Sequence, residues 1–200
     1  MNKGIKIATG EWLVFMNAGD VFVDNNVIAK AEPFLHEEQL QILYGNIIRV
    51  FDKHKERKYP IRKNNIDAVD FLIGNIDHQA SFIRRSLFNK YGLYDTTYKL
   101  AADHYFFFKV VGINHEKTKY VNLDIAYFMM DGSSTKSIDK YKEEKESMYR
   151  KEFTYLYDNI KELSEYRSSS ILGFLLKIRM AIKRTGFNTR VKKILNFRFK

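Results

Sequence analysis

A short apolar run that leads directly into a polar turn is the feature that most constrains this chain. Residues 12–16 (WLVFM) are all apolar and are followed by Asn17-Ala-Gly-Asp20. A run of this length without a polar position predicts a strand buried on both faces of a sheet. Open α/β sheets bind their ligands beyond the carboxyl ends of such strands, so Asp20 lies where a functional residue is expected. The alternative for a single Asp in this place is a residue that only caps a turn.

Helix-like and strand-like segments alternate along the rest of the sequence, which is typical of an α/β domain. The segments expected to be helical are a helix ending near residue 10 and residues 27–35, 65–73, 86–91, 101–111 and 138–163. The segments expected to be strands are residues 41–51, 78–84 and 119–130. Helix 138–163 is expected to be exposed, because it carries charge pairs four residues apart.

The basic character of the chain belongs to its C-terminal tail. The net charge is +10, and residues 171–200 hold nine Lys/Arg and no Asp/Glu. Basic and apolar residues alternate there in the manner of helices that lie on an anionic membrane surface, and a solvated basic face is the alternative. Two such helices are expected, at 169–185 and 189–199. A membrane span needs roughly 18 uninterrupted apolar residues, and Lys177 and Arg179 interrupt the best candidate.

Composition excludes several classes of function. The chain has no cysteine, which excludes a disulfide framework, thiolate catalysis and a zinc site with cysteine ligands. No recognisable nucleic-acid-binding motif accompanies the basic tail, so no nucleic-acid partner is expected. Residues 1–10 lack the apolar core and cleavage site of a signal peptide. We therefore expect a cytoplasmic location, with peripheral attachment to the inner face of the cytoplasmic membrane through residues 171–200.

Several short motifs follow one another in a fixed order. They are Asn2-Lys3-Gly4, Thr9-Gly10-Glu11, Asn17-Ala-Gly-Asp20, His78-Gln79, Gly92-Leu-Tyr-Asp95 and Ala-Ala-Asp103. In this order and spacing the chain resembles the family 2 glycosyltransferases, which are inverting enzymes of the GT-A fold. Within that family it resembles the bacterial branch that acts in polysaccharide and O-antigen assembly. The resemblance runs from Met1 to about Ser134.

The resemblance implies an α/β GT-A fold, the nucleotide-diphospho-sugar transferase fold, with a mixed sheet, flanking helices and a basic helical tail. Residues 1–136 would form a partial GT-A domain, and residues 137–200 a helical extension. Members of the family carry further strands before the motif at which this sequence starts, and those strands would cover residues 12–16. We therefore expect a domain that is truncated at its N-terminus and of low stability alone.

The resemblance also assigns residues to the sugar donor. The leaving nucleoside diphosphate develops negative charge, which a hard divalent cation neutralises through oxygen ligands. By resemblance, Asp20 holds Mg²⁺ or Mn²⁺ against the diphosphate, and Asn17 replaces the first acid of the usual Asp-x-Asp motif as a neutral donor contact. Asn2 and Lys3 are expected at the diphosphate, where a lysine offers a point charge. The alternative for Asn2 and Lys3 is a helix surface that faces solvent.

On the acceptor side, an inverting transfer needs one base that takes the proton of the attacking hydroxyl. The resemblance points to Asp103, and the alternative for this residue is a helix N-cap worth about 1 kcal/mol. By resemblance, His78 and Gln79 would contact the diphosphate or the acceptor, whereas a single histidine taken by itself is more often a polar core residue or a hydrogen-bond donor at a strand end. The function implied is transfer of a hexose from a nucleotide sugar to a glycan or lipid-linked acceptor. The alternative is a sugar- or membrane-binding module that keeps the fold without catalysis.

Overall fold

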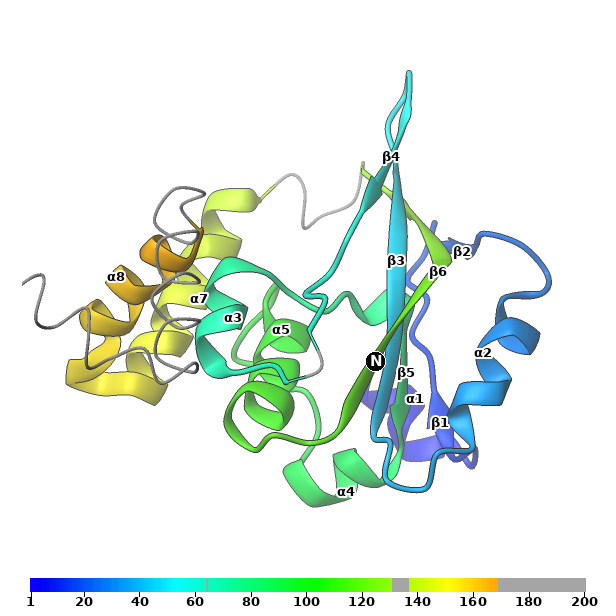
Figure 1. Cartoon of the computed structure of the whole chain (residues 1–200), viewed down its shortest axis with the longest axis horizontal. Coiled ribbons are helices and arrows are strands. Elements are labelled where there is room, and N and C mark those ends of the chain that lie inside the picture. The colour runs from blue at the N-terminus through cyan, green and yellow to red at the C-terminus, as the bar shows by residue number, and fades with distance from the viewer. Residues whose placement is uncertain (64, 131–136, 169–200) are drawn as a thin grey trace, which may run out of the picture. The chain divides into compact units, whose positions relative to one another are not determined.

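The computed structural model of the chain describes residues 1–63, 65–130 and 137–168 (Figure 1). By its internal contacts the chain divides into two compact units, Met1–Tyr157 and Asp158–Lys200. The sheet and the helices that cover it belong to the first unit. Most of the second unit, including the two predicted basic helices, lies outside the described residues.

The described strands form one mixed six-stranded sheet. The strands are β1 (Trp12–Leu13), β2 (Val21–Phe22), β3 (Ile42–Val50), β4 (Lys55–Lys58), β5 (Ser81–Arg84) and β6 (Thr118–Met129). Their order is β1-β5-β3-β6-β2, and β4 pairs with β3 farther along than β5 does. Only β3 and β6 are parallel, whereas every other described pair is antiparallel. The predicted mixed sheet is thereby confirmed.

The helices agree with most of the predicted segments. They are α1 (Asn2–Ile7), α2 (Val27–Leu35), α3 (Ala68–Ile73), α4 (Ser86–Tyr91), α5 (Ala102–Phe107), α7 (Ile138–Phe153) and α8 (Tyr157–Ser168), with 3-10 turns η1 (His78–Ala80) and η3 (Thr154–Leu156) and the π-helical segment η2 (Phe108–Ile113). The predicted helix 101–111 therefore changes from α to π geometry after Phe107. None of the described helices is long and apolar enough to cross a membrane.

Side chains of the central strands alternate between two cores, one on each face of the sheet. Ile42 and Tyr44 of β3 enter a core formed with helices α3, α4, α5 and α7, whereas Leu43 enters a core formed with α2. This is the period of two that a strand imposes on its side chains. Figure 1 shows α2 on one side of the sheet and α3, α5 and α7 on the other.

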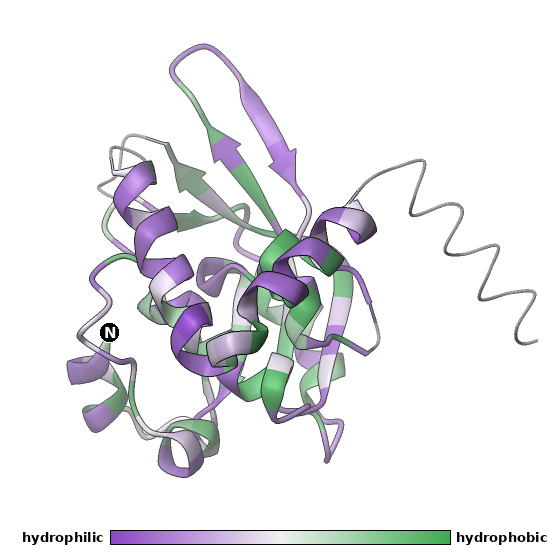
Figure 2. Cartoon of the chain, turned by 90° about the vertical axis from the view of Figure 1, so that its left-hand side faces the viewer, coloured by the Kyte–Doolittle hydropathy of each residue, from purple (hydrophilic) through white to green (hydrophobic). Residues whose placement is uncertain are grey.

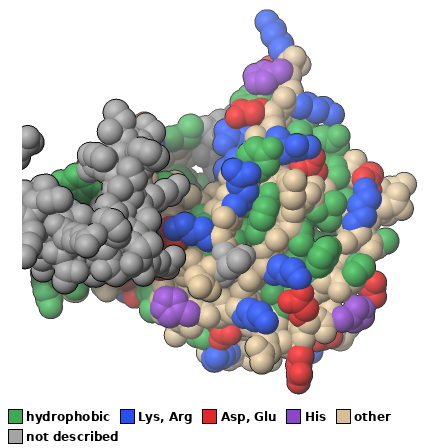
Figure 3. All heavy atoms as spheres, viewed as in Figure 1, with side chains coloured by type: hydrophobic (Ala, Val, Ile, Leu, Met, Phe, Trp, Pro, Cys, Tyr) green, Lys and Arg blue, Asp and Glu red, His purple; other side chains and the backbone are tan. Residues whose placement is uncertain are grey.

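The hairpin of β3 and β4 extends beyond the cores. Three of the four residues of β4 are exposed, and Figure 2 shows this strand as hydrophilic along its length. Lysine and arginine side chains gather over the hairpin in Figure 3. β4 therefore contributes charge to the surface rather than apolar area to a core.

Residues 12–16 differ from their prediction. Only Trp12 and Leu13 form a strand, and the run is partly exposed rather than buried on both faces. The physical reason is that β1 has a strand neighbour, β5, on one edge only among the described residues. A continuously apolar run predicts burial, but burial requires neighbours on both sides.

A register break between β3 and β6 brings the two strands very close together at Gly45. The pairing skips from Tyr44 to Asn46 at this point, and a Cβ added to Gly45 would lie 2.4 Å from the Leu123 carbonyl oxygen. A glycine is needed because two backbones meet there.

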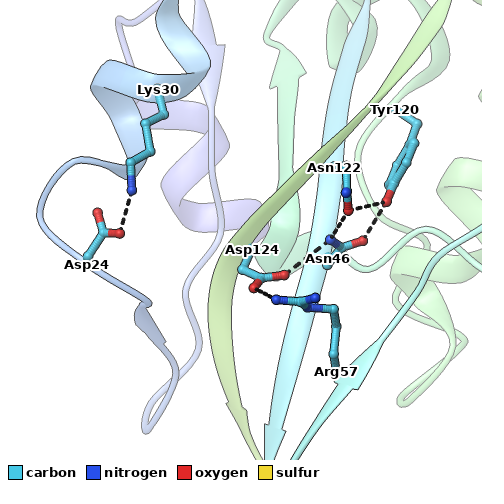
Figure 4. A network of polar contacts seen from close by, with 7 residues as sticks. All are labelled: Asp24, Lys30, Asn46, Arg57, Tyr120, Asn122 and Asp124. Atoms are coloured by element: carbon cyan, nitrogen blue, oxygen red, sulfur yellow. Dashed lines mark hydrogen bonds and ion pairs between the residues drawn. The ribbon is translucent and has the colours of Figure 1, made fainter.

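Asn46, the residue after Gly45, stabilises the register break between β3 and β6 through its side chain. Its buried carboxamide donates to Asn122 Oδ1 (3.1 Å) and Asp124 Oδ1 (3.2 Å) and accepts from the Tyr120 hydroxyl (2.9 Å). Arg57 of β4 pairs with Asp124, so the network also links the hairpin to β6 (Figure 4). The side-chain bonds replace the backbone pairing that the break interrupts.

Helix α7 belongs to the unit that contains the sheet. This compact unit ends at Tyr157, and the division after residue 136 stays a prediction. Helix α7 belongs to this unit because Met148 and Tyr149 are buried in the same core as α5. Helix α7, which is highly charged in the sequence, therefore packs against the core through a few apolar residues.

We expect Gly45→Ala to destabilise the fold by about 1–3 kcal/mol or more, because the added methyl group has no room. The matched control is Gly4→Ala, since nothing lies within 4 Å of a Cβ added to Gly4, and alanine is favoured over glycine in a helix. Urea unfolding measures both variants. A shared midpoint for the two variants would contradict the steric role of Gly45.

Candidate active site

Three residues predicted from distant parts of the sequence meet in one hydrogen-bonded series. Asn17 follows β1, His78 opens η1 just before β5, and Asp103 lies in the first turn of α5. The Asn17 carboxamide nitrogen lies 3.0 Å from His78 Nε2, and His78 Nδ1 lies 2.6 Å from Asp103 Oδ2. Because β1 and β5 are neighbours in the sheet, the turn after β1 and the turn before β5 lie at the same end of it.

The direction of the two His78 hydrogen bonds depends on which ring nitrogen carries the proton. When the Asn17 amide donates to Nε2, Nδ1 must carry the proton and donate it to Asp103 Oδ2. The His78 side chain is 9% exposed, whereas the Asp103 side chain is 22% exposed. Of the pair, the carboxylate is the group that a substrate can reach.

The two groups shift each other's pKa in opposite directions. Burial favours the neutral imidazole, but the Asp103 charge and hydrogen bond, with Asp77 and Asp20 farther off, raise the pKa of His78 above its usual value. Burial likewise works against the Asp103 carboxylate, but His78 outweighs it and lowers the pKa of Asp103. Asp103 is therefore ionised at neutral pH, as a base must be.

Asp20 is the last residue of a tight turn, and one of its two carboxylate oxygens makes no hydrogen bond to the described residues. Its backbone N–H donates to the Asn17 carbonyl (3.0 Å), and Gly19 has a φ of +96°, which suits glycine at the third position of a type II turn. Oδ1 accepts from the Met129 N–H (3.3 Å). Oδ2 is buried and has no hydrogen-bond partner among the residues described. A buried carboxylate oxygen without a partner fits a hard divalent cation.

Asn2, Lys3 and Gln79 are not part of the hydrogen-bonded series. The Asn2 carboxamide donates to the Tyr94 carbonyl (2.8 Å) and accepts from the Tyr94 N–H (3.1 Å), which fastens α1 to the loop after α4. Lys3 is exposed on α1. Gln79 is buried in η1, next to His78.

His104, the residue after Asp103, is held in the neutral state. Its Nε2 lies 2.5 Å from the Tyr149 hydroxyl, which in turn donates to the Phe71 carbonyl (2.7 Å). Burial, and then the positive charge of Lys145, lower the pKa of His104 well below its usual value. His104 is therefore a neutral residue of the core.

Side chains of α7 line the region beside α5, and sequence reasoning missed them. Lys145 is the clearest case: its ammonium lies 5.6 Å and 5.8 Å from the ring centroids of Tyr141 and Tyr149. Burial and the charge of Lys58 lower the pKa of Lys145 to about 8, against the opposing effect of Asp103. In the sequence, the only signal for a role of α7 side chains is their position on the same face as the few apolar residues of this helix.

A separate hollow of about 510 Å³ lies beside the network of Figure 4. Its charged side chains are already paired, Asp24 with Lys30 at 2.7 Å and Asp124 with Arg57. The Tyr127 ring is covered by the Lys55 ammonium at 4.2 Å. These pairings indicate a solvated groove rather than a second catalytic centre.

Lys145→Met is expected to raise the free energy of unfolding at pH 7 by about 3 kcal/mol, because the pKa of Lys145 is lowered from 10.5 to about 8 and each pKa unit corresponds to about 1.36 kcal/mol. Because the pKa of Lys145 is lowered, the unfolded chain binds more protons than the folded chain between pH 8 and the ordinary pKa of lysine. The free energy of unfolding of the wild-type chain therefore rises with pH over this range. The advantage of the variant should therefore shrink over that range. Thermal unfolding from pH 7 to 10, with the exposed Lys142→Met as control, tests this, and equal effects of the two variants would contradict it.

Comparison with known proteins gives a consistent result. Residues 1–92 match the family model described as Glycosyl transferase family 2. The chain is 32% identical over 144 residues to PGL/p-HBAD biosynthesis glycosyltransferases of Mycobacterium bovis and Mycobacterium tuberculosis. That alignment covers 70% of this chain and 54% of each relative, so the chain spans about half the length of the curated relatives that it matches.

The fold is also similar to a solved structure. The crystal structure of S. aureus TarS 1-349 matches with a TM-score of 0.57 and 15% sequence identity. The match covers 91% of this chain and 55% of that chain. At this identity the similarity concerns the fold, a GT-A-like arrangement of a mixed sheet with flanking helices.

Proposed function

Because the chain belongs to glycosyl transferase family 2, we propose that it forms part of an enzyme that transfers a sugar from a nucleotide-sugar donor to a glycan or lipid-linked acceptor in cell-surface polysaccharide synthesis. The observation that carries the proposal is the series Asn17–His78–Asp103, which joins the predicted donor turn to the predicted base. The alternative, a sugar- or membrane-binding protein of the same fold, requires no such arrangement.

In this proposal Asp103 is the base of an inverting transfer. His78 occupies Oδ2, which leaves Oδ1 to accept the proton of the acceptor hydroxyl. As that proton leaves, the hydroxyl oxygen bonds to the anomeric carbon and the bond to the diphosphate breaks on the opposite side. Positioned proton transfer of this kind contributes about 10²–10⁴-fold to rate.

We propose that Asp20 holds Mg²⁺ or Mn²⁺ through its buried Oδ2. A bound cation would neutralise the charge that develops on the leaving diphosphate. The described residues contain no group of three or more His, Asp or Glu that could hold a metal by themselves. Diphosphate oxygens and water would supply further ligands, as is usual for Mg²⁺.

The remaining donor contacts are proposed with smaller roles. Lys3 offers its exposed ammonium to the diphosphate. Asn2 acts through its bonds to Tyr94, which hold α1 in place. Gln79 lies beside His78 and contributes its carboxamide to the diphosphate or the acceptor.

We also propose that residues 171–200 bind an anionic membrane surface. Their nine Lys/Arg are accompanied by no acid, and each basic residue near such a surface contributes about 1 kcal/mol. A lipid-linked acceptor would be met at the same surface.

The test is sugar transfer with a panel of nucleotide sugars and Mn²⁺, measured for the chain and for the longest form of the protein encoded in the same reading frame. Asp103→Asn is expected to lower kcat by at least about 10²-fold, because the base is lost. Asp20→Ala is expected to remove the dependence on added metal together with most of the activity. Asp52→Asn, an exposed aspartate, is the matched control.

Two outcomes would count against the proposal. Equal turnover by Asp103→Asn and Asp52→Asn would remove Asp103 from the mechanism. Donor or vesicle binding without turnover in every form of the protein would favour the non-catalytic alternative.

A further inference from the structure

A single carboxylate of helix α7 binds three consecutive backbone N–H groups. Glu144 Oε1 accepts from the N–H of Lys99 (3.1 Å), and Glu144 Oε2 accepts from those of Leu100 (2.8 Å) and Ala101 (3.0 Å). These residues directly precede α5, whose first turn carries Asp103. Residues 99–101, which lead to the proposed base Asp103, are thus hydrogen-bonded to helix α7.

The sequence of α5 explains why an outside group is needed. The N-cap position is Ala101, which has no side-chain acceptor and makes no capping bond. Groups at a helix N-terminus need acceptors from elsewhere when the cap residue supplies none. Glu144 binds the N–H of the N-cap residue Ala101 and those of Lys99 and Leu100 before it, so it holds the segment that leads into the helix rather than the first turn itself.

Glu144 also keeps its charge in this position. Burial alone would raise the pKa of Glu144, but the N–H groups of Leu100, Ala101 and Lys99 lower it. Hydrogen bonds to an ionised acceptor are stronger than those between neutral groups. The entry to α5 is therefore held more firmly than a neutral cap would hold it.

Other contacts of α7 hold the segment that follows Asp103. Tyr149 bonds to His104 Nε2 at 2.5 Å, and Glu152 accepts from the Tyr105 hydroxyl at 2.5 Å. Residues 149 and 152 are three positions apart and share one side of α7, whereas Glu144 lies farther round the helix. Asp103 lies between two sets of α7 contacts, and Glu144 provides the set on its N-terminal side.

We propose that Glu144 is a positioning residue for sugar transfer: its three backbone hydrogen bonds fix the segment 99–101 and thereby set the place of the Asp103 carboxylate against His78. The inference rests on the proposed role of Asp103. Glu144 itself touches neither substrate. A displacement of about 1 Å in a reacting group can lower the rate about 10²-fold. A small shift of segment 99–101 would therefore be enough to slow sugar transfer.

The test compares Glu144→Gln and Glu144→Ala with the same two substitutions at Glu143, its exposed neighbour on α7. Gln keeps the size and one acceptor oxygen, whereas Ala keeps neither. We expect kcat, corrected for the folded fraction measured by circular dichroism, to fall about 10-fold for Gln and about 10²-fold for Ala. KM for the donor should stay within about twofold, because donor contacts are untouched.

The pH profile separates positioning from a general loss of stability. When Asp103 is no longer held against His78, its pKa should rise toward the ordinary value, so the acid limb of kcat should move to higher pH in Glu144→Ala. Unfolding alone would lower kcat at all pH values without moving the limb. An unmoved limb, or kcat values equal to those of the Glu143 variants, overturns the inference.

Asp103→Asn, measured in parallel, distinguishes this failure from failure of the proposed function. If Asp103→Asn is inactive while the Glu144 variants match the Glu143 variants, only the role of Glu144 is wrong. If Asp103→Asn keeps full turnover, the proposed base is wrong, and the role of Glu144 falls with it.

Discussion

Strand β3 is the constraint on which the rest of the structure depends. It pairs with β4 and β5 along one edge and with β6 along the other, and both of its faces are buried. It contributes no residue to the site. Nevertheless β5 places η1 and its His78, and the far end of β6 provides the Met129 N–H that binds Asp20. A rigid centre with functional groups on its neighbours is how many α/β proteins position a site.

Sequence alone predicted the elements that have strong local signals. The strand 41–51 was recognised because β-branched and aromatic residues run through it, and β3 (Ile42–Val50) agrees closely. Gly92 directly follows the predicted helix 86–91, and its φ of +87° suits a glycine at the end of α4. By contrast, the burial of residues 12–16 could not be read from the run itself, because the number of neighbouring strands is not a local property.

The sequence singles out candidate residues for the site but not the hydrogen bonds between them. Asn17, His78 and Asp103 were chosen one by one through the resemblance, and nothing in the sequence indicated that they bond to one another. The contribution of α7 was missed for a different reason. Glu144 lies among many charged residues, and a carboxylate that binds backbone groups has the same sequence signature as one that faces solvent. Only the fold distinguishes the two cases.

The two histidines next to Asp103 differ in the charge that their surroundings favour. His78 is the one whose positive charge the surroundings favour, whereas His104 is kept neutral by the core around Tyr149. Compensating charge is therefore concentrated at Oδ2, the oxygen bound to His78. The backbone N–H of His104 also bonds to this carboxylate, so both histidines help to keep Asp103 ionised, one through its ring and one through its backbone. The two imidazoles are both buried, and they differ because carboxylates surround His78 whereas Lys145 lies near His104.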